Sequence, residues 1–253
     1  MPITVGSLLI YLLILFRIMG CIMLLPFFGQ GMMIQVKGAL SIMLALLLFP
    51  ATALGIEAPA LDFSYVVLAA EEVLTGLIMG FVVQLAFNII TVAGEIASQE
   101  MGFKMASQMD PITGMQIPSI TQFYNLFAIL LFLGINGHYW VLEILSRSFR
   151  LAPIGSLSIT SGFGEWFANL FSRFFSMGIR LSAPIFLLML MISVGVGLLA
   201  KLVEGINVFD IGFPVRIGMG LLFIMFFIPF MAQTLQRAFV ALNEGLMNLL
   251  MAI

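Results

Sequence analysis

Few residues of this chain are of the types that carry out catalysis, and their spacing does not suit that task. The one histidine, His138, stands in the sequence NGHYW, among aromatic residues typical of a membrane interface. Glu71 and Glu72 are adjacent, so on a helix they point about 100° apart and do not form a facing acid–base pair. We expect these two carboxylates near the start of a helix, where negative charge is favoured. The one cysteine, Cys21, excludes a disulfide framework and a cysteine-based metal site.

The common enzyme signatures are also missing from the sequence. It contains no H-E-x-x-H, no G-x-S-x-G, no G-x-x-x-x-G-K-[ST] and no G-x-G-x-x-G. We therefore expect no enzymatic activity, no cofactor and no metal. The net charge is −2 and no basic cluster occurs, which argues against binding to nucleic acid.

The composition indicates a membrane protein. Of 253 residues, 62% are apolar and 9% are charged. A soluble domain is about 45–50% apolar and about 25% charged, so it could not bury this much hydrocarbon in one core. The ten-residue alternation typical of a membrane β-barrel is absent. We expect an all-α fold of polytopic membrane-type hairpins.

Apolar runs of roughly 20 residues, the length that spans a bilayer, recur along the chain. They predict six long helices, at Ser7–Phe28, Gly38–Ile56, Val66–Thr91, Phe127–Leu145, Leu181–Ala200 and Ile217–Gln236. The weaker run Gly155–Met177 predicts one or two shorter helices. Prolines fall in or at the ends of several runs, so some helices should be kinked.

Gly76 and Gly80 form a small-xxx-small step inside the third run, which allows another backbone to approach closely. That neighbour can be another helix of the same chain or a different subunit. Both readings stay open at this point.

The segment after the third run, GEIASQEMGFKMASQMDPITGMQIPSI, is poor in bulky aliphatic residues. Met101, Met105 and Met109 recur every four residues, which predicts a methionine stripe on one helix face. Asp110 before Pro111 predicts the end of that helix, because a residue preceding proline avoids helical backbone. The residues that follow predict an apolar loop. Such a segment fits a plug against a pore wall, and it also fits a connector that faces solvent.

Two motifs occur in a fixed order among these apolar runs: GEIASQEMGFKMASQMDP after the third run and INVFDIGFPVRIGMGL before the last. In its motifs and in its pattern of segments, the chain resembles the FliR family of the flagellar type III export gate, whose injectisome relatives share the plan. The resemblance covers essentially the whole chain. Neither motif is catalytic.

The resemblance implies a single-copy subunit of a gate in the bacterial inner membrane, within the flagellar basal body. The implied partners are FliP and FliQ type subunits, with FlhB and FlhA type export components beside them, around a channel for unfolded export substrates. Residues 1–125 are then expected to resemble the larger subunit FliP, and residues 126–253 the smaller subunit FliQ.

The resemblance also implies site residues. The loop at 102–118 is expected to plug the resting channel, and the matching residues are Met101, Gly102, Phe103, Met105, Met109, Asp110, Pro111, Ile112, Gly114, Met115, Ile117 and Pro118. A second set is expected to pack against neighbouring subunits: Gly76, Gly80, Asn207, Asp210, Pro214 and Arg216.

A different class of function remains as an alternative. A small secondary transporter also uses broken helices and a few buried charges. Its substrate or proton groups would be Arg17, Glu71, Glu72, Asn88 and Asp210. Two halves with matched segment spacing would favour this reading, and the sequence has none.

Overall fold

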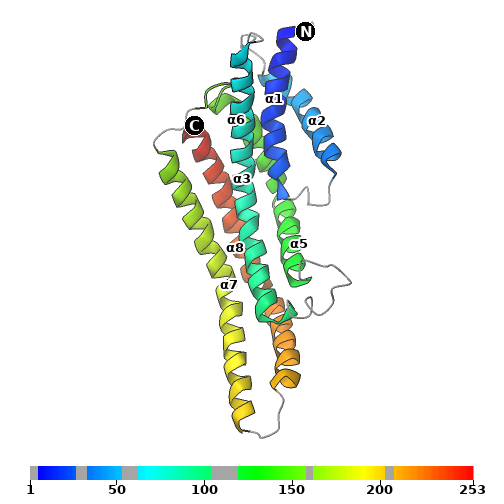
Figure 1. The fold of residues 1–253 in the computed structure, drawn as a ribbon, viewed down its shortest axis with the longest axis vertical. Helices are drawn as coiled ribbons and strands as arrows, with labels where there is room; N and C mark the ends of the chain where they lie inside the picture. Colours follow the sequence, from blue (N-terminus) through cyan, green and yellow to red (C-terminus); the bar gives the residue numbers. More distant parts are fainter. Residues whose placement is uncertain are drawn as a thin grey trace. The chain divides into compact units, whose positions relative to one another are not determined.

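The computed structural model describes residues 5–26, 33–52, 62–103, 119–157, 162–202 and 208–252, which are almost entirely helical (Figure 1). Within these ranges there are seven helices and no strand. The helices are α1 (Val5–Leu24), α2 (Ile34–Thr52), α3 (Phe63–Glu100), α5 (Ser119–Gly134), α6 (Gly137–Leu151), α7 (Phe163–Leu202) and α8 (Val208–Ala252). The all-α, membrane-type fold class is confirmed.

Helix boundaries fall at residues that favour a change of backbone conformation. α3 ends at Glu100, and Gly102 then adopts a φ of 88°, which glycine accepts without steric cost. Asn136, with a φ of 59°, separates α5 from α6, and the two helices are bent by 67° at this break. Asparagine is one of the few other residues that visit the left-handed region.

The number of helices long enough to cross a membrane is smaller than the sequence predicts. Within the described ranges, α1, α3, α7 and α8 qualify by length and composition, and the bent pair α5–α6 makes a fifth if it is one span. The predicted run Phe127–Leu145 falls on the bent pair α5–α6 and not on a single helix, because Asn136 interrupts it. The predicted run Gly38–Ile56 corresponds to α2, whose apolar part, Ile34–Pro50, is too short to qualify.

The weak run Gly155–Met177 is also different from the prediction. From Phe163 onward it is the first part of α7, a helix of 40 residues that continues through Pro184. Glu165 and Arg173, which interrupt the apolar pattern, lie on exposed or half-buried positions, so they do not break the helix. The described part of the second motif, from Val208 onward, also belongs to a long helix, α8.

The chain forms two compact units, and each draws on separate parts of the sequence. Unit 1 consists of Met1–Ala86, Asn136–Leu170 and Val240–Ile253, and unit 2 of Phe87–Ile135 and Phe171–Phe239. This division by contacts is distinct from the division into residues 1–125 and 126–253, which concerns likeness to two partner subunits and stays a prediction.

In unit 1, α1 and the first part of α3 are in backbone contact, and α1 also lies beside α2 (Figure 1). A Cβ on Gly76 would clash with the carbonyl oxygen of Arg17, and one on Gly80 would lie 2.6 Å from the carbonyl oxygen of Cys21. From the other side, a Cβ on Gly20 would lie 2.7 Å from the carbonyl oxygen of Val73. The small-xxx-small step thus packs helices of one chain, and α1 occupies the face that another subunit would need.

In unit 2, three phenylalanines from three helices meet in the core. The ring centroids of Phe87 (α3), Phe132 (α5) and Phe239 (α8) are 5.0–5.3 Å apart. All three side chains are buried. Aromatic pairs at this spacing contribute about 0.5–1.5 kcal/mol beyond the area that they bury.

We predict that Gly76→Ala destabilises the protein by about 1–3 kcal/mol, because α1 must move away from the added methyl group. Gly195→Ala is the matched control. It lies in the interior of α7, nothing in the described chain would contact its Cβ, and alanine favours helix by about 1 kcal/mol over glycine. Thermal unfolding in mild detergent compares the two variants, and equal midpoints would contradict the packing described above.

Candidate functional site

An ion pair lies inside unit 1 and joins two helices that are distant in sequence. Arg17 of α1 donates from Nε to Glu72 Oε2 of α3 at 2.6 Å, and from Nη2 to Glu72 Oε1 at 2.9 Å. Both side chains are only 1% exposed. Two parallel hydrogen bonds are the strong geometry for an arginine and a carboxylate. Neither charge is left unpaired in the interior.

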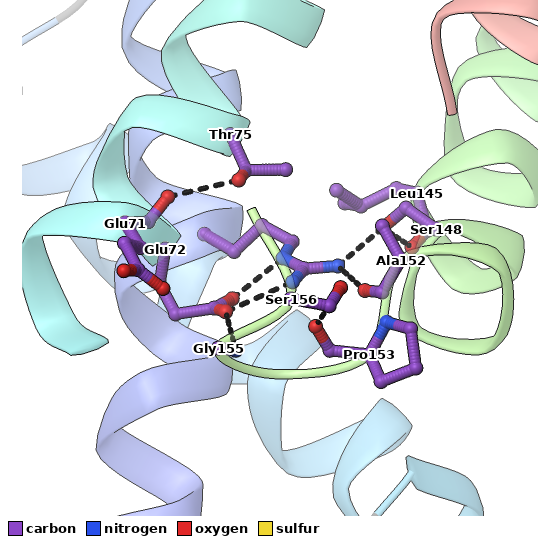
Figure 2. Close-up of polar contacts among 10 residues, drawn as sticks. Glu71, Glu72, Thr75, Leu145, Ser148, Ala152, Pro153, Gly155 and Ser156 are labelled. Atoms are coloured by element: carbon purple, nitrogen blue, oxygen red, sulfur yellow. Dashed lines mark hydrogen bonds and ion pairs between the residues drawn. The ribbon is translucent and has the colours of Figure 1, made fainter. Parts of the chain in front are cut away.

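The same guanidinium also binds the C-terminal end of α6. Arg17 Nη1 donates to the carbonyl oxygen of Ala152 at 2.8 Å and to Ser148 Oγ at 3.3 Å. Ser148 Oγ in turn donates to the carbonyl oxygen of Leu145 at 2.8 Å (Figure 2). The last carbonyls of a helix lack partners and carry the negative end of its dipole, so a cation is favoured there.

The turn after α6 completes the network around the carboxylate. The N–H of Gly155 donates to Glu72 Oε1 at 3.2 Å, and Gly155 has a φ of 77° that suits glycine (Figure 2). Arg17 Cζ lies 4.5 Å from the ring centroid of Phe149, a distance typical of a cation–π contact. One arginine thus connects α1, α3 and α6.

Sequence reasoning missed this network. Glu71 and Glu72 do not lie at the start of a helix as expected, because α3 starts at Phe63, two turns earlier, after Asp62. Arg17 and Glu72 are 55 residues apart, so no local motif joins them. A signal was nevertheless available, because a charge inside an apolar helix needs a partner.

The residues that a secondary transporter would use have different surroundings. Arg17 and Glu72 bind each other and hold helices together. Glu71 is half-buried, and its Oε2 has no hydrogen-bond partner in the described chain. Asn88 and Asp210 are exposed residues of unit 2. The buried charges of Arg17 and Glu72 thus have a structural role.

Metal and cofactor ligands are scarce in the described residues. No group of three or more His, Cys, Asp or Glu side chains there is arranged to hold a metal ion. The ring centroids of His138 and Tyr139 lie 4.3 Å apart with the rings tilted by 36°, and Cys21 is buried in α1.

In unit 2, the helices on either side of the predicted plug segment contact each other close to where that segment begins and ends. A Cβ on Gly94 of α3 would lie 3.0 Å from Thr121 Cα and 3.0 Å from Tyr124 Cβ of α5. One turn further along, Thr91 Oγ1 donates to Asn125 Oδ1 at 2.8 Å. α3 and α5 are therefore antiparallel neighbours at residues 91–94 and 121–125.

The first residues of the plug segment are packed into unit 2. Met101 lies in the turn after α3 rather than on that helix, and it is 0% exposed. Its Cε atom would lie 2.6 Å from a Cβ on Gly220 of α8. Gly102 lies against the ring of Phe213, also of α8, and Phe103 is half-buried. These contacts anchor the start of the segment.

The remaining plug residues lie outside the described residues, and their predicted role is not tested. They are Met105, Met109, Asp110, Pro111, Ile112, Gly114, Met115, Ile117 and Pro118. Asn207 of the second motif also lies outside them.

The described residues of the second motif belong to the first turns of α8. Asp210 lies in the first turn of α8, where the positive end of the helix dipole favours a carboxylate. Arg216 Nη2 donates to Ser193 Oγ of α7 at 2.9 Å, which ties the two helices together. Pro214 lies within α8, between Asp210 and Arg216 in the sequence. Contact of these residues with neighbouring subunits stays a prediction.

We predict that Glu72→Gln destabilises the protein by about 3–5 kcal/mol, because Arg17 then keeps a buried, unpaired charge. Glu143→Gln removes the same charge from an exposed pair with Arg147 and should cost less than about 1 kcal/mol. The double variant Arg17→Leu with Glu72→Leu should cost less than Glu72→Gln, since it removes both charges. Unfolding midpoints of the purified protein in detergent measure these differences. Equal shifts for Glu72→Gln and Glu143→Gln would show that the buried pair adds no stability.

Comparison with known proteins identifies the family. Residues 8–242 match the family described as bacterial export proteins, family 1. The chain is 30% identical over 235 residues to the flagellar biosynthetic protein FliR of Pectobacterium carotovorum subsp. carotovorum, which covers 92% of this chain and 90% of that protein. It is 29% identical over 205 residues to FliR of Escherichia coli (81% and 78% covered), and 26% identical over 216 residues to the Yop proteins translocation protein T of Yersinia pestis (83% and 82% covered). The resemblance to FliR found in the motifs is confirmed, and the chain belongs to the bacterial export proteins, family 1.

Proposed function

We propose that this chain is a single-copy subunit of the flagellar type III export gate. In this proposal it sits in the bacterial inner membrane and assembles with FliP and FliQ type subunits around a channel for unfolded export substrates. The flagellar relatives named above are 29–30% identical to this chain over most of its length, which supports the flagellar assignment.

The observation that carries the assembly part of the proposal is the apolar surface left uncovered by α7 and α8. In their most apolar stretches, only 11% of α7 and 17% of α8 is buried within the chain, against 61% of α3. Exposed apolar surface of this extent needs lipid or protein neighbours. A multi-subunit membrane complex supplies both.

The proposal that residues 102–118 form a plug is supported by the packing of the helices on either side of them. Gly94 brings α3 against α5, and Met101 fills the space beside Gly220. A segment that joins two helices packed against each other can move aside while those helices keep their contacts. We propose that its methionine and isoleucine side chains seal the channel, since methionine repacks easily and still excludes water.

We further propose that FlhB and FlhA type components act beside the gate, and that the energy for export comes from elsewhere in the apparatus. The sequence holds no motif for nucleotide hydrolysis. The proposed likeness of residues 1–125 to FliP and of 126–253 to FliQ belongs to the same assembly model.

A tagged copy of the chain, extracted from its host membrane in mild detergent, tests the assembly. We expect a large particle that holds one copy of this chain with several copies of two smaller membrane proteins. The measurement is native mass spectrometry. A particle of 27.7 kDa, or of twice that mass, would mean a monomer or a homodimer and would contradict the proposal.

Deleting Ile112–Gln116 should raise ion leak through the assembled gate several-fold, because the seal loses its apolar contacts. Single-channel conductance of the purified complex in planar bilayers measures the leak. Met115→Leu, which keeps an apolar side chain, is the matched control and should stay closed. If the deletion variant assembles and conducts no better than this control, residues 102–118 do not plug the channel.

A cross-link separates a channel-lining subunit from a structural scaffold. A photoreactive residue at position 112 or 115 should attach to an export substrate trapped in transit. The same photoreactive residue at exposed Tyr139 of α6 in unit 1 should not. No product at 112 or 115 would leave the chain as a scaffold.

A further inference from the structure

A cavity of about 490 Å³ lies between α7 and α8 in unit 2. Its lining combines two arginines and one hydroxyl group with apolar side chains: Met177, Arg180, Ala183, Pro184, Leu187, Phe230, Thr234 and Arg237. The lining contains no acidic residue. A cavity of this character attracts an anion and can also hold a hydrocarbon group beside it.

Both guanidinium groups are free to bind a ligand. Arg180 and Arg237 are exposed, and neither guanidinium group makes a hydrogen bond or ion pair with any residue that the structure describes. Arg17 and Arg216, by contrast, are bound to Glu72 and Ser193. Two like charges that face one cavity repel each other, and an anion between them removes that repulsion.

Arg180 and Arg237 also lie at the same position along the helix pair α7–α8. Arg180 directly precedes the apolar run Leu181–Ala200, and Arg237 directly follows the run Ile217–Gln236. Because both line the same cavity, they lie at the same end of the two runs. A helical run of 20 residues is about 30 Å long, which is the thickness of the bilayer hydrocarbon. Lipid phosphates lie at the boundary of that layer.

We propose that this cavity binds the phosphate headgroup of an anionic phospholipid. Arg180 and Arg237 hold the phosphate oxygens through their forked N–H donors, a geometry that matches phosphate well. Thr234 donates a further hydrogen bond. The acyl chains continue along exposed Leu187 and Phe230 on the membrane side.

A carboxylate from a neighbouring subunit is the main competing occupant. One carboxylate fills only a small part of about 490 Å³, and it gives no reason for the apolar walls. Both the volume and the level at the end of the apolar runs favour a lipid. Basic pockets between membrane helices are known to bind anionic headgroups in this way.

The test uses the assembled complex in phosphatidylcholine nanodiscs that contain a photoreactive phosphatidylglycerol. Labelled peptides of this chain are mapped by mass spectrometry. We expect label on peptides that contain 177–187 and 230–237, and competition by unlabelled phosphatidylglycerol. Arg180→Gln with Arg237→Gln should weaken the labelling roughly 30-fold, given about 1 kcal/mol for each basic residue near an anionic lipid surface.

Two further variants isolate the site. Arg147→Gln with Arg150→Gln removes the same charge from α6 in unit 1 and should leave the labelling unchanged. Ala183→Phe fills the cavity, keeps both arginines and should abolish the labelling, which serves if the arginine variant fails to assemble.

Three results would overturn the proposal. One is equal labelling of wild type and the Arg180→Gln, Arg237→Gln variant. Another is competition by inorganic phosphate as strong as that by the lipid, which indicates a site for a free anion. The third is a zero-length carbodiimide cross-link from Arg180→Lys or Arg237→Lys to a carboxylate of another subunit. None of these outcomes depends on whether residues 102–118 plug a channel.

Discussion

The charge of Arg17 must be neutralised inside an apolar interior, and the way this is done fixes how the helices of unit 1 meet. A guanidinium presents its donors in one plane, so acceptors from α3, α6 and the following turn must come to it. Gly76, one turn after Glu72, makes this approach possible, because any larger residue would push away the backbone of Arg17. The close backbone contact and the buried ion pair are therefore parts of one interaction, and each depends on the other.

The helical class was predictable because it depends on local composition and run length. Val66–Thr91 lies within α3, and Leu181–Ala200 lies within α7, as expected. The helix boundaries that differ from the prediction depend on single residues and on their tertiary context. Asn136 bends a run that reads as one span, and α7 continues through polar positions because they can face outward. The partners of Arg17 come from two parts of the chain, around Glu72 and around Ser148–Ala152, that are distant from it in sequence, so only the fold brings them together.

For the candidate site, the sequence predicts which segment forms the plug, and the structure shows how the first residues of that segment are packed. The methionine pattern predicts Met101 on a helix, whereas α3 ends one residue earlier, at Glu100, and Gly102 then takes a left-handed conformation. The two arginines of the α7–α8 cavity were equally hidden in the sequence. There they read as isolated charges at the edges of two apolar runs, and only the pairing of the helices places them around one cavity.

The interleaved composition of the two units has a consequence for how the protein is made. Unit 1 includes Val240–Ile253, which the ribosome synthesises after all of unit 2 and after the rest of unit 1. Domains usually fold one after another as the chain emerges, but unit 1 is complete only after residues 240–253 have been made. Its early helices must stay in a competent, unfinished state while unit 2 is being inserted. Completion of unit 1 thus depends on contacts between residues that are far apart in the sequence, and such contacts form slowly.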